Sequence, residues 1–245
     1  MKTILGYEYP TMKDIKDKFA ELYKKYKAGE YELVNGTIEF FAPTYVIERD
    51  EESFRPASKE YIEREKQWYL TQSLNVHDIP GKCPKIWEMV SDDDGTINSN
   101  YGWMCFSPEN GNQYEECRKE LIRDPNSRRA TMIFNRPSMH KDQHGKFGNM
   151  QDFCCTYAYQ YLLRNGKLNM VVYMRSNDFG GFGINNDSAW AFYMMDKMVE
   201  DLNNNPEGIE LGPIEAGDLI WSAASTHVYE RDFKFIEEYV NETGV

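Results

Sequence analysis

The stretch DFCCTYAYQYLLRNGKLNMVVYMRSND, residues 152–178, predicts a β-hairpin. Two runs rich in aromatic and aliphatic residues flank Asn165 and Gly166, and Asn-Gly between such runs is the strongest short-range signal for a two-residue turn. This turn pairs Arg164 with Lys167 and fixes the register of both strands. The hairpin therefore brings a cysteine pair at its start and an Arg-Ser-Asn-Asp run at its end to the same edge of a sheet.

Counting back from the turn places Cys155 opposite Ser176, and Thr156 opposite Arg175. A thiol beside a guanidinium is expected to shift toward the thiolate, because the charged form gains a partner. Cys154 points to the other face, where it would behave as a small buried hydrophobe. One β-bulge would exchange the two faces, and a strand cysteine is more often a plain core residue. We nevertheless favour Cys155 as the reactive cysteine, because other basic residues accompany it.

The elements around the hairpin predict an α+β fold. They follow one another without the regular alternation of a doubly wound α/β protein, and no linker divides the chain, so residues 1–245 are expected to form a single domain. Besides the hairpin, we expect strands over 36–47 (interrupted at Pro43), 130–135 and 217–230, and helices over 11–28, 58–72, Glu109–Leu121, 188–202 and at the C-terminus.

The composition limits the classes of partner. The chain has 245 residues and a formal net charge of -12. Binding a nucleic-acid polymer needs a basic face, whereas a few arginines suffice for a single nucleotide. No apolar run reaches the length of a membrane span, and the N-terminal apolar stretch is too short for a signal peptide. We therefore expect a cytoplasmic protein with neither a membrane nor a nucleic-acid polymer as partner.

The cysteines and histidines do not form a metal-binding pattern. There is no Cys-x-x-Cys pair and no His-Glu-x-x-His motif, so we expect free thiols in a reducing compartment and no bound metal. The cysteines stand at 83, 105, 117, 154 and 155, and the histidines at 77, 140, 144 and 227.

Residues outside the hairpin complete a candidate anion site. Arg128 and Arg129 form a second basic pair in NSRRA, and His227 stands alone in STHVY. Taken singly, an arginine pair is usually a solvated surface feature and a strand histidine a structural one. Together with Cys155 they indicate a thiol enzyme acting on a small anion, and a cysteine protease would fit this pattern equally well.

From about Tyr61 to the C-terminal helix, the chain resembles the thymidylate synthase family, and most closely its deoxycytidylate hydroxymethylase branch from T-even bacteriophages. The step from Cys155 to Arg175 matches the family spacing. The resemblance implies a large mixed β-sheet with β-bulges, packed by helices, whose sheet forms a dimer interface. It rests on motifs that occur in the family's order: YIEREKQWY, PKIW, NSNYGW, PNSRR, RPSM, MQDFCCT, QYLLRNGKL, RSND, NDSAW and HVY.

The resemblance also implies substrates and site residues. The substrates would be dCMP (or dUMP) and 5,10-methylenetetrahydrofolate as co-substrate, with no metal, and Cys155 would attack C6 of the pyrimidine. In the implied homodimer, Arg128 and Arg129 would reach across to the partner's phosphate site. The catalytic residues would be Cys155, Glu65 and Asp187; the nucleotide-binding residues Arg128, Arg129, Arg175, Ser176, Gln160, Asn186, His227 and Tyr229; and the folate-binding residues Trp87, Tyr101 and Asp178.

The residue that selects the base is either Asp187 or Asn186. Anchoring on the Ala-Trp of GINNDSAW selects Asp187, whose carboxyl group suits the exocyclic amine of cytosine. RSNDFGGFGINND is one residue longer than the phage pattern, so counting from Arg175 selects Asn186 instead. The amide of Asn186 suits uracil. We favour Asp187.

The product and the phosphate contacts leave further alternatives. DFCC lacks the Pro-Cys-His of the reducing enzymes, and EEYVNETGV lacks their apolar closing tail. We therefore expect water to add to the methylene group attached at C5 and give a hydroxymethyl group. If the protein is phage-encoded, the reaction would take place in the host cytoplasm. The alternatives are a dUMP hydroxymethylase, a thymidylate synthase or dCMP methylase, and an inactive nucleotide-binding relative. The family's N-terminal arginine loop has no counterpart in YELVNGTIEF, where Lys27 is the nearest cation.

Overall fold

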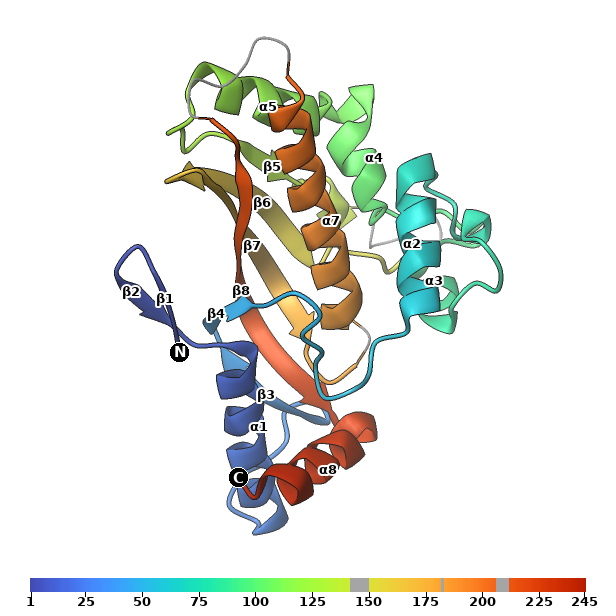
Figure 1. The fold of residues 1–245 in the computed structure, drawn as a ribbon. Helices are drawn as coiled ribbons and strands as arrows, with labels where there is room; N and C mark the ends of the chain where they lie inside the picture. Colours follow the sequence, from blue (N-terminus) through green and yellow to red (C-terminus); the bar gives the residue numbers. More distant parts are fainter. Residues whose placement is uncertain (142–149, 182, 206–211) are drawn as a thin grey trace.

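A six-stranded mixed sheet forms the centre of the computed structural model, which describes residues 1–141, 150–181, 183–205 and 212–245 (Figure 1). The strand order is β3-β8-β7-β6-β5, and β4 also pairs with β8. Only β7 and β8 are parallel; the other pairs are antiparallel. The strands are β3 (Thr37–Phe41), β4 (Thr44–Ile47), β5 (Thr131–Ile133), β6 (Thr156–Arg164), β7 (Lys167–Asp178) and β8 (Glu215–Tyr229).

The helices pack around this sheet and give the α+β architecture that the sequence predicts. Figure 1 shows α7 lying along the sheet with α5, α4 and α2 beside it, while α1 and α8 pack together near β3. None of the described helices is long and apolar enough to cross a bilayer. The helices are α1 (Met12–Lys27), α2 (Lys59–Thr71), α3 (Lys85–Val90), α4 (Tyr101–Phe106), α5 (Gln113–Arg123), α6 (Met139–Lys141), α7 (Gly183–Asn203) and α8 (Phe233–Thr243).

The central hairpin confirms the predicted turn but not the predicted register at its open end. Arg164 pairs with Lys167, as expected from the Asn-Gly turn. A β-bulge at Tyr157 then shifts the pairing by one residue, so Thr156 lies opposite Met174. The predicted pairing of Cys155 with Ser176 and of Thr156 with Arg175 is therefore wrong. Instead, the backbone N–H of Arg175 donates to the carbonyl of Cys155 at 2.8 Å.

The parallel pairing of β7 with β8 aligns the ends of two strands that are distant in the sequence. Ser176 lies beside Ser225, and Asp178 lies beside His227. Parallel strands end at the same edge of a sheet, so their last side chains share one neighbourhood. The start of β6 reaches the same edge through the hairpin.

Capping residues determine where the predicted helices begin. The hydroxyl of Thr11 accepts from the backbone N–H of Asp14, whose carboxylate accepts in return from the backbone of Thr11. Ser58 caps α2 in a similar way through its hydroxyl group. Such caps satisfy N–H groups that have no partner within the helix.

Three parts of the helix prediction differ from the structure. The helix expected over 188–202 begins earlier, at Gly183, because the polar run from Asn185 to Asp187 lacks the apolar periodicity by which a helix is predicted. The helix expected over Glu109–Leu121 begins only at Gln113, because Pro108–Asn110 form a separate 3₁₀ turn that ends at Gly111 in a left-handed conformation. The six-residue helices α3 and α4 were not predicted. Each is too short to show more than one helical repeat of apolar residues.

The outer face of the sheet, opposite to the face on which α7 lies, is less covered by other elements. A groove there is lined by Leu162, Val171 and Tyr173 from the hairpin and by residues of β1 (Lys2–Ile4) and β2 (Tyr7–Tyr9). Tyr173 retains 38% of its accessible surface.

We expect Gly102→Ala to destabilise the protein strongly, because α4 approaches α2 so closely that a Cβ at Gly102 would overlap the backbone carbonyl of Tyr69. Overpacking against an immobile backbone costs about 3 kcal/mol. The free energy of unfolding from chemical denaturation measures this. The control is Gly111→Ala. A Cβ at Gly111 would meet no atom within 4 Å, but the backbone φ is +76°, so this substitution should lower the free energy of unfolding by only about 1 kcal/mol. Equal losses in both variants would contradict the close approach.

Candidate active site

Cys155 and Arg175 meet at the open end of the central hairpin. Nη2 of Arg175 lies 3.6 Å from Sγ of Cys155. The guanidinium is held by backbone carbonyls, since Nε donates to Cys154 at 3.0 Å and Nη2 to Phe153 at 2.6 Å. Because no carboxylate forms an ion pair with it among the described residues, the charge of Arg175 remains available to an anion.

The electrostatics at Cys155 differ from the predicted shift toward thiolate. Burial raises the pKa of Cys155 to about 11, although Arg175 acts in the opposite direction, and the negative charge of Asp187 raises the pKa further. The expected net shift is therefore wrong for the protein without substrate, because desolvation outweighs one guanidinium. Cys154 is fully buried, as predicted, and its pKa is raised by burial to about 12.

Glu65 stands at the centre of a buried hydrogen-bond network on α2. The hydroxyl of Tyr61 donates to Oε1 at 2.6 Å, the indole N–H of Trp87 donates to Oε1 at 3.2 Å and to the Tyr61 oxygen at 2.8 Å, and the amide of Asn186 donates to Oε2 at 3.0 Å. Burial raises the pKa of Glu65, while these three donors lower it. They fix the orientation of the carboxyl group.

Asn186 and Asp187 both lie near the start of α7 but differ in their partners. Asn186 is committed to Glu65 through its NH₂ group, and its Oδ1 is buried without a hydrogen-bond partner in the described part of the chain. The carboxyl group of Asp187 forms no hydrogen bond or ion pair with any described residue. Burial, together with the charges of Glu65 and Asp178, raises the pKa of Asp187 to about 8. Asp187 is therefore mainly a neutral acid at pH 7, able both to donate and to accept.

The ends of β7 and β8 supply a second group of polar side chains. Asp178 accepts from the backbone N–H of Gly181 at 3.0 Å, and burial raises its pKa to about 6 despite Arg231 at 3.5 Å. His227 is 7% exposed, and its ring makes an edge contact with Tyr229. The guanidinium of Arg231 lies 4.0 Å above the Tyr229 ring. Ser176 is half-buried on β7, the strand that also carries Asp178.

Two predicted folate-side residues lie on the helices next to this edge. Trp87 contributes its indole N–H to the Glu65 network from α3. Tyr101 opens α4, and its hydroxyl accepts from the backbone N–H of Thr156 at 3.3 Å, next to Cys155. Both residues therefore touch groups that adjoin the candidate catalytic side chains.

The structure does not bring every candidate residue to Cys155. The amide of Gln160 donates to the carbonyl of Arg128 at 2.8 Å and accepts from Tyr173 at 3.4 Å, so it belongs to another part of the sheet. Arg128 is exposed, and Arg129 is 72% exposed while paired with Glu120 at 2.9 Å. Their position outside this chain's own site fits side chains that serve a neighbouring molecule.

Comparisons with known proteins identify the family. A family model described as thymidylate synthase matches residues 53–244. The deoxycytidylate 5-hydroxymethyltransferase of Enterobacteria phage T2 is 46% identical over 205 residues, which cover 84% of this chain and 80% of that protein. The chain belongs to the thymidylate synthase family.

Two further matches agree with this family. The phage T4 deoxycytidylate 5-hydroxymethyltransferase is 46% identical over 203 residues, 83% of this chain and 80% of that protein. The solved structure of thermostable thymidylate synthase A from Bacillus subtilis shares the fold, with a TM-score of 0.63 and 21% identity over 84% of this chain and 71% of that chain. The predicted thymidylate synthase-like α+β fold is thereby confirmed.

Within this thymidylate synthase-family site, Tyr61 was missed by sequence reasoning. It stands four residues before Glu65 on the same helical face, which places its hydroxyl against the carboxylate. That spacing was visible in YIEREKQWY, but an aromatic residue at helical spacing is usually a core residue.

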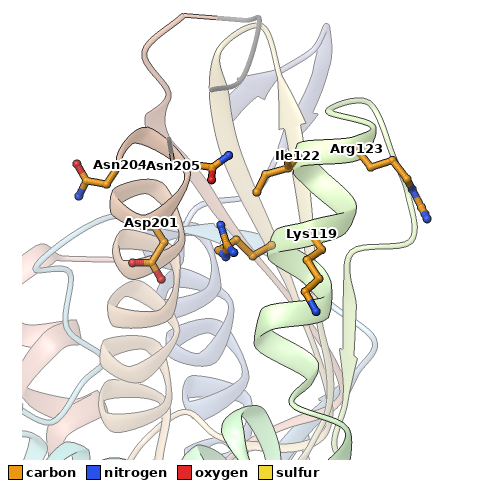
Figure 2. A pocket seen from close by; sticks show the side chains of 7 residues that line it. Lys119, Ile122, Arg123, Asp201, Asn204 and Asn205 are labelled. Carbon is orange, nitrogen blue, oxygen red and sulfur yellow. The ribbon is translucent and has the colours of Figure 1, made fainter. Parts of the chain in front are cut away.

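A separate hollow lies away from this site. Figure 2 shows it between α5, with Lys119, Ile122 and Arg123, and the end of α7, with Asp201. Lys119 pairs with Glu116 at 2.9 Å, and Arg123 pairs with Glu120. Since these charges are already compensated on exposed surface, the hollow offers little to an anion. No group of three potential metal-ligating side chains occurs within the described ranges.

We expect Asp187→Asn to stabilise the folded protein increasingly between about pH 4 and pH 8. The carboxyl keeps its proton in the folded protein up to about pH 8, whereas an unfolded aspartate ionises near pH 4, so the wild type loses stability over this window. An upper bound on the effect is roughly 5 kcal/mol at pH 8, about 1.4 kcal/mol per pH unit. Urea denaturation at a series of pH values measures the difference.

The control for this series is Glu60→Gln on the same side of the sheet. Its side chain is 84% exposed, so its stability difference from the wild type should not change appreciably over the same pH range. A stability difference for Asp187→Asn that is also independent of pH would show that Asp187 is ionised in the folded protein.

Proposed function

We propose that this protein transfers a one-carbon unit from 5,10-methylenetetrahydrofolate to C5 of dCMP and releases 5-hydroxymethyl-dCMP. The observation that carries the proposal is the carboxyl group of Asp187, which has no partner among the described residues, close to the half-buried thiol of Cys155 and to the Arg175 guanidinium, which has no carboxylate partner there. Two relatives at 46% identity have the corresponding name. The proposed reaction involves neither a membrane nor a nucleic-acid polymer. It would take place in the cytoplasm, which would be that of the host if the protein is phage-encoded.

The covalent step assigns the nucleophile to Cys155. Its Sγ bonds to C6 of the pyrimidine, and the electron pair of the C5–C6 double bond makes C5 a nucleophile toward the methylene carbon of the folate. Loss of the C5 proton and expulsion of tetrahydrofolate leave an exocyclic methylene group. Water then adds its oxygen to that carbon, and departure of the Cys155 sulfur restores the double bond.

Base selection follows from the protonation of Asp187. Cytosine presents an acceptor at N3 and a donor at its exocyclic amine. A neutral carboxylic acid matches both, because its O–H donates and its carbonyl oxygen accepts. The unpaired Oδ1 of Asn186 is a further acceptor at this position. Uracil presents a donor at N3 and an acceptor at O4. Asp187 could match uracil only with its hydrogen on the other oxygen, and the Oδ1 of Asn186, whose NH₂ group is used on Glu65, would then face the O4 acceptor with a second acceptor.

Glu65 is suited to hold water and transfer protons at the base. A carboxyl group fixed by Tyr61, Trp87 and Asn186 cannot rotate away from the bound nucleotide. A fixed carboxyl group of this kind could orient a water molecule for attack on the exocyclic methylene group. The alternatives are a dUMP hydroxymethylase, a thymidylate synthase or dCMP methylase, and an inactive nucleotide-binding relative.

The remaining site residues are assigned by the family resemblance and their positions. Arg175 and Ser176 would bind the phosphate, and the folate would face Trp87, Tyr101 and Asp178. His227 and Tyr229 would bind the sugar hydroxyl group, with Asn186 near the base and Gln160 ordering the region around Arg128.

A homodimer fits the exposed parts of the sheet. Leu162, Val171 and Tyr173 leave apolar surface on the outer face, which a second copy of the sheet would bury. Arg128 and Arg129 lie at the edge of that region and would reach the partner's phosphate site. Residues 1–245 would act as one domain within this dimer.

Tritium release from C5-labelled nucleotides tests the proposal. With methylenetetrahydrofolate present, we expect release from dCMP and little from dUMP, and a product mass that corresponds to a hydroxymethyl group. Cys155→Ser should abolish release, because a serine hydroxyl is a much weaker nucleophile. Cys154→Ala is the matched control and should retain release per folded molecule. Release from dUMP alone, or from neither nucleotide, would contradict the proposal.

A second prediction concerns the selecting residue. Asp187→Asn should shift the ratio of kcat/KM for dCMP and dUMP toward dUMP by about 100-fold or more, because an amide can orient either its oxygen or its NH₂ toward the base. Asn186→Asp is the control at the neighbouring position and should not favour dCMP further. An unchanged ratio in Asp187→Asn would remove this residue as the selector.

A further inference from the structure

A hydrogen-bonded chain leads from β3 to His227. The hydroxyl of Ser225 donates to Oε1 of Glu39, and the same hydroxyl oxygen lies 3.2 Å from Nδ1 of His227. The antiparallel pairing of β3 with β8 puts Glu39 directly opposite His227. Ser225 stands two residues before His227, on the same face of β8.

The backbone of Glu39 is itself fixed. Its carbonyl accepts from the hydroxyl of Tyr31 at 2.9 Å, and its N–H donates to the same Tyr31 oxygen at 3.2 Å. The Glu39 side chain is half-buried rather than free in solvent. The chain of groups is therefore built on two strands and does not depend on a loose surface side chain.

Counting hydrogens in this chain assigns the tautomer of His227. A carboxylate can only accept, so the single hydrogen of the Ser225 hydroxyl is used on Glu39. The Ser225 oxygen can then only accept from the histidine ring. Nδ1 must therefore carry the ring hydrogen, and Nε2 is left as an acceptor with a free lone pair.

We propose that Glu39 and Ser225 are positioning residues that hold His227 in the Nδ1–H tautomer, so that its Nε2 accepts a hydrogen bond from the 3′-hydroxyl group of the nucleotide sugar. This rests on the proposed function for the identity of the ligand. The ligand class is a nucleotide with a free 3′-hydroxyl donor; a 3′-deoxy or 3′-phosphorylated nucleotide offers no such donor.

Two observations support this role. Burial lowers the pKa of His227; the charge of Glu39 acts against this shift and Arg231 and Arg175 act with it, so the net direction still favours the neutral ring that an acceptor requires. Glu39 lies outside residues 53–244, to which the family model is matched. This relay from Glu39 through Ser225 to His227 gives the N-terminal segment a part in the site, although residues 31–40 contain no arginine to offer the phosphate.

The first test reads the tautomer directly, with no nucleotide present. In ¹⁵N-histidine-labelled protein, the two ring nitrogens give distinct shifts for the protonated and unprotonated forms, and His227→Gln identifies the signals of this residue. We expect the wild type and Ser225→Thr, which retains the hydroxyl, to carry hydrogen on Nδ1. Glu39→Gln should move hydrogen to Nε2, because the amide can donate to Ser225 and turn its hydroxyl toward Nδ1. Hydrogen on Nε2 in the wild type would overturn the relay.

The second test measures nucleotide affinity by calorimetry for dCMP and its 3′-deoxy analogue. Loss of one well-placed hydrogen bond should weaken dCMP binding about tenfold in Ser225→Ala and Glu39→Gln, with little change for the 3′-deoxy analogue. Ser225→Thr should restore affinity. Glu21→Gln, on an exposed face of α1, controls for the change of charge.

The outcomes separate the relay from the proposed function. Equal weakening for both nucleotides would indicate general distortion and would overturn the relay. A wild type that binds no dCMP would count against the proposed function, while the tautomer measurement would still decide whether Glu39 and Ser225 control His227.

Discussion

The candidate site depends on how the guanidinium of Arg175 is held. It donates to two backbone carbonyls of the segment that carries Cys154 and Cys155, and it forms no ion pair with a described carboxylate. A carbonyl fixes a guanidinium without neutralising it, whereas a carboxylate would cancel the charge that an anionic ligand needs. The same two bonds clamp the end of β7 to the start of β6 and so hold the thiol 3.6 Å from Nη2. The β-bulge at Tyr157 makes this possible, because it brings the backbone of Arg175 opposite Cys155.

Two acidic groups near this cation are held in their neutral forms. Burial raises the pKa of Cys155 to about 11 and of Asp187 to about 8. Asp178, with a pKa of about 6, is mainly ionised at pH 7 but lies 3.5 Å from Arg231. In a chain with a formal net charge of -12, further ionised groups beside Arg175 would repel a phosphate dianion. In the proposed reaction the thiol would lose its proton after the nucleotide has bound, when the ring offers a carbon to which the sulfur can bond.

The sequence predicted what local signals determine. Asn165-Gly166 specified the turn, Thr11 and Ser58 specified two helix starts, and alternation of apolar residues specified the long strands. The register at Cys155 was wrong because a bulge is stabilised by contacts beyond the hairpin, here a hydrogen bond from Phe134 to the carbonyl of Tyr157. The raised pKa of Cys155 could not be predicted either, since desolvation depends on how completely α2, α4 and α7 cover the sheet edge. The assembly of Glu65 with Asn186 joins positions that are 121 residues apart, and no local pattern indicates such a contact.

The two residues at the start of α7 show why one inserted residue need not decide base selection. Successive residues on a helix point about 100° apart, so the side chains of Asn186 and Asp187 leave α7 in different directions. Asn186 is held by Glu65, and this bond fixes the rotation of the first turn. Its neighbour is then the residue left without a partner, with its carboxyl close enough to Cys155 and Tyr101 to influence both pKa values. The alignment counted from Arg175 and the alignment counted from the Ala-Trp pair therefore select adjacent residues that have different partners. Under the proposed function, the amide of Asn186 would position Glu65 as the general acid–base residue, and the unpartnered acid of Asp187 would recognise the base.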